Sequence, residues 1–176
     1  IDLRTAGIGR AVRAAGDGYV SRVRCSPWGY GKAVYVRLAD GNTAVYAHLD
    51  DYEDRLRDYV RRAQHAREAY TVDLYPDAGR FPVSRGQVVA KSGQTGIGAP
   101  HLHYELRNAA QEPLNPRLLG VDWPDDTRPR IRAVVVCPRG PGARVNGDVA
   151  PVRLPARETA PGRYACEPVT ARGEIG

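Results

Sequence analysis

The chain lacks methionine, has only two lysines and three cysteines, and contains no apolar run long enough to span a bilayer. Without such a run, no transmembrane segment is expected within these 176 residues. Because Ile1 opens a chain that lacks methionine, the sequence is interpreted as a fragment or a processed piece, with any export signal upstream. Cys25, Cys137 and Cys166 show no metal-ligand spacing. Two interpretations stay open: a Cys137–Cys166 disulfide in an oxidising compartment, or three unpaired, apolar-like cysteines.

The scarcity of lysine means that the formal net charge of +6 is carried almost entirely by arginine. The arginines are spread along the chain and no nucleic-acid motif accompanies them, so no nucleic-acid partner is expected. A modest positive charge fits an anionic polymer instead. A biotinyl or lipoyl carrier is also disfavoured, because neither Lys32 nor Lys91 is flanked by methionine.

Hydrophobic residues make up 42% of the chain and charged residues 26%, which is typical of a globular protein. Residues 33–38 and 43–49 alternate around an Asp-Gly-Asn turn and predict a hairpin. Residues 51–67 change to a helical period, with Leu56, Tyr59, Val60 and Ala63 on one face. The fold expected is mainly β: an antiparallel sheet domain with one inserted helix.

Three segments are expected along the chain. Residues 1–120 form the sheet domain, which closes near Asn115-Pro116. Residues 121–130 are rich in Asp and Pro and predict a linker. Residues 131–176 contain short strands separated by Gly and Pro, which predicts a partial, β-sandwich-like unit.

A glycine-rich turn over residues 93–98 leads into a strand at 101–106, and this stretch carries the chemistry. Successive side chains of a strand point to opposite faces, so His101, His103 and Glu105 share one face. Two imidazoles on a rigid strand suit a divalent metal, above all zinc, and allow one histidine to act as acid or base. A solvated strand face that happens to carry two histidines is the alternative.

Further segments give this motif its context: Tyr46-Ala47-His48-Leu49, residues 86–96, residues 14–20, residues 29–32, and the opening Ile1-Asp2-Leu3-Arg4-Thr5. Together these segments resemble the lysostaphin/LytM-type zinc metallo-endopeptidases, which cut peptide cross-bridges of peptidoglycan. The resemblance covers roughly the first two-thirds of the chain, which is about one domain.

The resemblance implies a zinc cofactor and a role for each matched residue. Asp2 corresponds to the carboxylate ligand of zinc, and His103 corresponds to a histidine ligand. His48 and His101 correspond to the catalytic histidines. The third ligand, a histidine four residues before Asp2, is expected upstream of Ile1. No substrate-binding residue is identified.

The function implied is hydrolysis of peptidoglycan peptides in the periplasm, cell envelope or extracellular space of a bacterium. The alternative is a non-catalytic LytM-type module that binds the cell wall or activates an amidase. Such members have typically lost zinc or catalytic residues, so the presence of Asp2, His48, His101 and His103 favours the enzyme.

Overall fold

The structure is a computed structural model that describes residues 1–120 and 127–176. The chain divides into two compact units, Ile1–Trp123 and Pro124–Gly176. Most of the predicted linker, residues 121–126, lies outside the described residues, so the domain boundaries stay a prediction. Among the described residues, no helix has the length and apolarity needed to cross a membrane.

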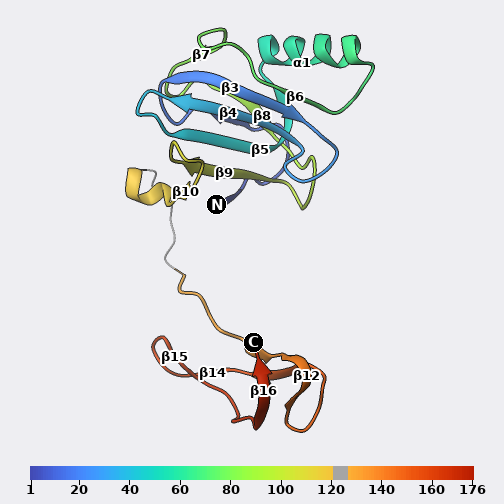
Figure 1. The fold of residues 1–176 in the computed structure, drawn as a ribbon. Coiled ribbons are helices and arrows are strands. Elements are labelled where there is room, and N and C mark those ends of the chain that lie inside the picture. Colours follow the sequence, from blue (N-terminus) through green and yellow to red (C-terminus); the bar gives the residue numbers. More distant parts are fainter. Residues whose placement is uncertain (121–126) are drawn as a thin grey trace. The chain divides into compact units, whose positions relative to one another are not determined.

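The first unit is built on a ten-stranded sheet in which every pairing is antiparallel (Figure 1). Its main path runs β1-β9-β5-β4-β3-β6, while β10 pairs with β9, β7 with β3, and β8 with both β2 and β5. The predicted mainly β fold with an antiparallel sheet is therefore confirmed. The strands are β1 Asp2–Arg4, β2 Ala11–Arg13, β3 Gly18–Cys25, β4 Lys32–Leu38, β5 Thr43–Tyr52, β6 Val72–Leu74, β7 Pro82–Val83, β8 Val88–Ser92, β9 His101–Arg107 and β10 Pro113–Leu114.

The inserted helix, α1 (Asp54–Arg67), begins three residues later than the 51–67 predicted. Asp51 is still in β5 and pairs with Lys91 of β8, so the strand delays the helix. Glu53 caps the helix by accepting hydrogen bonds from two backbone N–H groups of its first turn. Leu56 and Val60, one turn apart, are buried against the sheet. A 3-10 helix, η1 (Pro116–Leu119), follows β10.

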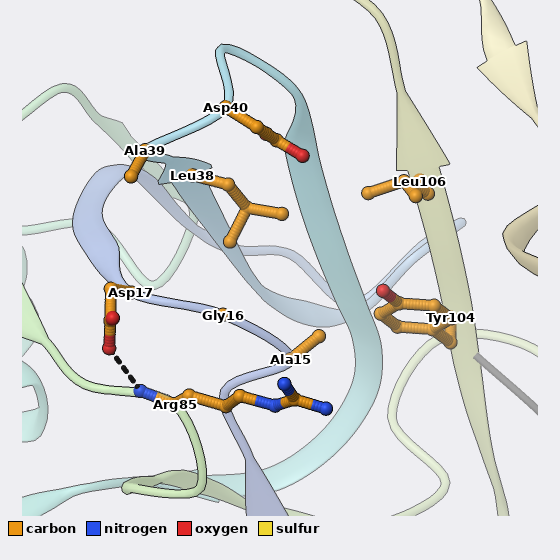
Figure 2. A pocket seen from close by; sticks show the side chains of 9 residues that line it. All are labelled: Ala15, Gly16, Asp17, Leu38, Ala39, Asp40, Arg85, Tyr104 and Leu106. Carbon is orange, nitrogen blue, oxygen red and sulfur yellow. Dashed lines mark hydrogen bonds between the residues drawn. The ribbon is translucent and has the colours of Figure 1, made fainter. Parts of the chain in front are cut away.

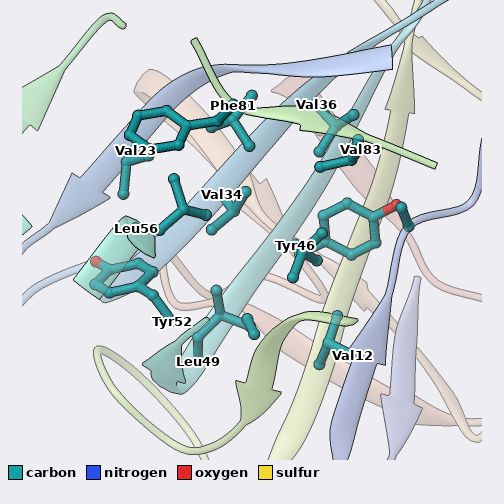
Figure 3. Close-up of a cluster of buried hydrophobic side chains, with 14 of the residues drawn as sticks. Val12, Val23, Val34, Val36, Tyr46, Leu49, Tyr52, Leu56, Phe81 and Val83 are labelled. Carbon is teal, nitrogen blue, oxygen red and sulfur yellow. The ribbon is translucent and has the colours of Figure 1, made fainter. Parts of the chain in front are cut away.

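The two faces of the sheet differ in character. One face carries the main core, whose buried side chains include Val34, Tyr46, Leu49 and Leu56 (Figure 3). The other face carries only a small cluster, formed by Ala33, Tyr35, Val45 and Ala47 with Tyr30 packed on it. We call this second side the outer face. The polar side chains of β9 that point to the outer face, His101, His103 and Glu105, are half-buried.

The described part of the second unit, residues 127–176, contains six strands in three two-stranded sheets: β11 with β13, β12 with β16, and β14 with β15. A packed sandwich of these sheets stays a prediction. All three cysteines are free: Cys25 is buried in the first unit, whereas Cys137 is half-buried and Cys166 is exposed. The strands are β11 Ala133–Val136, β12 Pro138–Val145, β13 Val152–Pro155, β14 Arg157–Ala160, β15 Arg163–Ala165 and β16 Ala171–Ile175.

Candidate active site

Strand pairing places the predicted β9 histidines beside the N-terminal carboxylate. In the β1–β9 register, Asp2 lies opposite His103 and Arg4 lies opposite His101. The Asp2 Oδ1 atom is 2.7 Å from His103 Nδ1 and 3.6 Å from His101 Nε2. Residues separated by about a hundred positions in the sequence thus meet at one end of the sheet.

His48 joins this group from β5, on the other side of β9. Its backbone is in the left-handed region, with φ of 58°, and its N–H donates to Tyr30 O at 2.9 Å. The β4–β5 and β5–β8 pairings are both irregular near this position. The His48 ring centroid lies 4.6 Å from that of His101 and 5.7 Å from that of His103. One ring nitrogen from each of the three histidines lies within 4.8 Å of the others.

The fourth histidine, His65, lies on α1 and is exposed, as predicted for a solvated helix residue. Of the predicted site residues, the structure therefore brings Asp2, His48, His101 and His103 together. A hollow of about 570 Å³ borders Asp2 and His101, so these two members of the group are open to a ligand.

Two of the histidines are held in a defined tautomer by backbone carbonyls. His48 Nδ1 lies 2.9 Å from Thr95 O, and His101 Nδ1 lies 2.7 Å from Ala99 O. A carbonyl oxygen can only accept, so each Nδ1 carries the proton and each Nε2 keeps its lone pair. Burial lowers the pKa of His48, which favours the neutral ring. Both rings can therefore accept a proton through Nε2.

The third histidine, His103, lies between two carboxylates. Its Nδ1 faces Asp2, and its Nε2 lies 2.6 Å from Glu105 Oε1. The hydrogen bond with His103 is the largest influence on the Asp2 carboxyl and lowers its pKa. The Tyr30 ring packs beside the imidazole, with centroids 5.2 Å apart. His103 is thus fixed in both position and orientation.

Glu105 also belongs to this cluster of side chains, although the sequence motifs assigned it no role. It accepts hydrogen bonds from the Tyr30 hydroxyl, from His103, and from Arg107 Nε at 2.6 Å. Burial raises the pKa of Glu105, but these hydrogen bonds outweigh it and lower the pKa to about 2. The only sequence signal was the alternation that put Glu105 on the same strand face as His103.

The glycine-rich turn is needed because backbones approach closely beneath the site. A Cβ on Gly31, whose φ is +62°, would lie 2.3 Å from Thr95 O, the carbonyl that holds His48. A Cβ on Gly96 would lie 2.1 Å from Gly29 O. Thr95 Oγ1 also accepts from the Lys32 backbone N–H at 2.9 Å. Glycine at Gly31 and Gly96 therefore allows a close backbone approach and a positive φ that a larger residue would disfavour.

The donor set fits zinc in chemical type. Imidazole nitrogens and a carboxylate are the ligands that catalytic zinc sites take from proteins, with a further position left open. The atoms of Asp2 and His103 that could bind a metal, Oδ1 and Nδ1, face each other. His103 also has the carboxylate behind its second ring nitrogen that metal-binding histidines commonly have.

The chain is similar to proteins that are described as peptidases. No protein-family model matches the chain. Over 121 residues, or 68% of the chain, it is 31% identical to the DD-carboxypeptidase/endopeptidase Mpg of Neisseria meningitidis serogroup B. The chain spans about a fifth of that relative's length, at 22%.

Solved structures similar to the chain include the catalytic domain of the antimicrobial peptidase lysostaphin from Staphylococcus simulans. It is 24% identical with a TM-score of 0.45, and the match covers 64% of this chain and 71% of that one. A zinc containing peptidase from Vibrio cholerae is 27% identical with a TM-score of 0.43, over 60% of this chain and 25% of that one. The chain resembles the lysostaphin-type peptidases, as its motifs predicted.

Proposed function

We propose that residues 1–120 form the hydrolytic domain of a zinc-dependent endopeptidase that cuts peptide cross-bridges of peptidoglycan. The observation that carries the proposal is the meeting of Asp2, His48, His101 and His103 at one end of the sheet. The similarity to an endopeptidase of Neisseria meningitidis supports the class of reaction. A peptidoglycan substrate implies a location in the cell envelope or outside the cell.

In this proposal Asp2 and His103 hold the metal. Glu105 accepts a hydrogen bond from the Nε2–H of His103, which leaves Nδ1, on the side of Asp2, to bind zinc. When bound, zinc would supply a Lewis acid that polarises the scissile carbonyl and lowers the pKa of water. The third ligand implied by the resemblance, a histidine upstream of Ile1, stays a prediction.

His48 and His101 are proposed to move the protons of hydrolysis. A water molecule attacks the scissile carbonyl carbon, and an Nε2 lone pair takes its proton. The same ring later gives that proton to the departing amide nitrogen. The other ring, when its Nε2 carries a proton taken from solvent, donates a hydrogen bond to the carbonyl oxygen as negative charge develops there. Thr95 O and Ala99 O accept hydrogen bonds from the Nδ1–H groups, which leaves the Nε2 lone pair of each ring available.

The test is release of soluble fragments from purified peptidoglycan by the protein, with and without a chelator and with zinc restored. We expect release that the chelator abolishes and zinc restores. His65→Ala is the matched control, because this histidine is exposed on α1 outside the site. Binding to peptidoglycan without release would instead support the wall-binding or amidase-activating module and overturn the proposal.

A further inference from the structure

A second hollow, of about 490 Å³, lies on the outer face of the sheet, between β3, β4, β5 and the turn that carries Gln111. The strand register links it to the site. Arg107, four residues beyond His103 on β9, pairs with Thr43, which pairs with Arg37, which pairs with Tyr19. Four strand residues span about 14 Å, so the hollow lies on the same face at that distance along β9.

The lining of this hollow is cationic and rich in hydrogen-bond donors. Its eight lining residues include two arginines and three tyrosines, and neither aspartate nor glutamate. Arg22 is already held: it donates to both oxygens of Asp73, at 2.8 and 2.6 Å, and stacks on the rings of Tyr35 and Tyr75. Arg22 therefore lines the hollow, but its charge is already paired with Asp73 and is not available to a ligand.

Arg37 is different. Among the residues that the structure describes, its guanidinium has a single hydrogen-bond partner, the Thr43 hydroxyl at 3.5 Å, and no carboxylate. Arg37 is half-buried, so its charge is partly shielded from water. A guanidinium presents paired N–H donors that match a carboxylate in shape, and such bidentate pairs are among the strongest hydrogen bonds in proteins.

The hollow drawn in Figure 2 differs from the outer-face hollow because both acidic and basic residues line it. It measures about 300 Å³ and lies on the core side, beside Tyr104 and Leu106. Asp17, Asp40 and Arg85 all border it, and Asp17 accepts a hydrogen bond from the Arg85 backbone N–H. Its two carboxylates would repel an anion, whereas no residue that lines the outer-face hollow carries a carboxylate.

We infer that the outer-face hollow binds a carboxylate of an acidic peptide, with Arg37 as the group that pairs with it. The inference rests on the proposed function, because the peptide is the one that extends from the hydrolytic site across the sheet face. An extended peptide advances about 3.4 Å per residue, so the carboxylate lies about four or five residues from the scissile bond. The hollow thus selects peptides by charge at a distance from the reaction.

The binding test uses two capped peptides, Ac-Ala-Glu-Ala-Ala-NH2 and its Gln isostere, titrated into the protein and followed by NMR. We expect saturable shifts at Arg37 and Thr43 with the Glu peptide and about 10- to 100-fold weaker binding of the Gln peptide. Arg37→Gln abolishes this difference, Arg37→Lys keeps part of it, and Arg85→Gln, at the hollow of Figure 2, leaves it intact. Equal binding of the two peptides, or competition by inorganic phosphate as effective as by the Glu peptide, would overturn the inference.

A kinetic test separates this inference from the proposed function. With peptidoglycan fragments as substrate, Arg37→Gln should raise KM about 10-fold or more and leave kcat unchanged, because Arg37 contributes binding alone. If the Glu peptide binds selectively but no fragment is hydrolysed, the proposed function fails and the carboxylate site stands. If hydrolysis proceeds and Arg37→Gln leaves KM unchanged, the carboxylate site fails and the proposed function stands.

Discussion

Replacing Glu105 with glutamine tests how the site holds His103. The carboxylate receives hydrogen bonds from Tyr30, His103 and Arg107, and its side chain is only 15% exposed. Hydrogen bonds to a charged group contribute roughly 1.5–3 kcal/mol each, and glutamine keeps the shape but not the charge. We expect Glu105→Gln to lower the free energy of unfolding by about 2–4 kcal/mol, since the Arg107 charge loses its partner.

The more specific effect of Glu105→Gln is on metal binding. Removing a carboxylate behind a metal-binding histidine typically weakens metal affinity about 10- to 100-fold. Chelator competition measures zinc affinity, and urea unfolding measures stability. Asp73→Asn is the matched control: it breaks the Arg22 ion pair on the same face, whose carboxylate is 38% exposed, and should cost about 1 kcal/mol or less. Unchanged zinc affinity in Glu105→Gln would refute the positioning of His103 by this carboxylate.

Three further predictions concern stability. Gly31→Ala should destabilise the protein by about 2 kcal/mol or more beyond Gly29→Ala, because both have φ of +62° but only the Gly31 Cβ would meet Thr95 O. Urea unfolding measures this difference, and equal costs would contradict the backbone approach described. Tyr104→Phe should be neutral or stabilising by up to about 1 kcal/mol, because its hydroxyl is buried without a hydrogen-bond partner among the described residues; a clear loss on thermal unfolding would show a missed partner. The hydrogen bond from Arg22 lowers the pKa of Asp73 in the folded protein. The Arg22–Asp73 pair therefore stabilises the fold fully above the pKa of the carboxyl in the unfolded chain, and this stabilisation is lost as pH falls through the lower pKa of the folded state. Acid titration of stability should therefore be flatter in Asp73→Asn, and identical curves would argue against the pair.

Local patterns predicted much of the first unit. The hairpin at residues 33–49 matches β4 and β5, and the strand at 101–106 matches β9. On β9 the alternation of residue types matches the burial, because Tyr104 and Leu106 are buried whereas Glu105 between them is half-buried. The helix start was placed too early, because helical periodicity near residue 51 does not reveal that Asp51 pairs with Lys91.

The site could be predicted as a set of residues but not as an arrangement. Alternation alone put Glu105 on the face of His103, yet its hydrogen bonds to Tyr30 and Arg107 depend on tertiary contacts. The left-handed backbone of His48 could not be predicted from the sequence either, because positive φ is uncommon in residues other than glycine. Contacts made by residues far apart in sequence were therefore the part that patterns could not supply.

The most direct test of the division of labour is zinc content measured together with fragment release in His101→Ala and His103→Ala. We predict that His103→Ala loses zinc, because it removes a metal ligand. His101→Ala should keep zinc and the fold while kcat for release of peptidoglycan fragments falls about 10²- to 10⁴-fold, as expected when a general acid–base group is removed. Loss of zinc from His101→Ala, or near-full hydrolysis by it, would contradict the account.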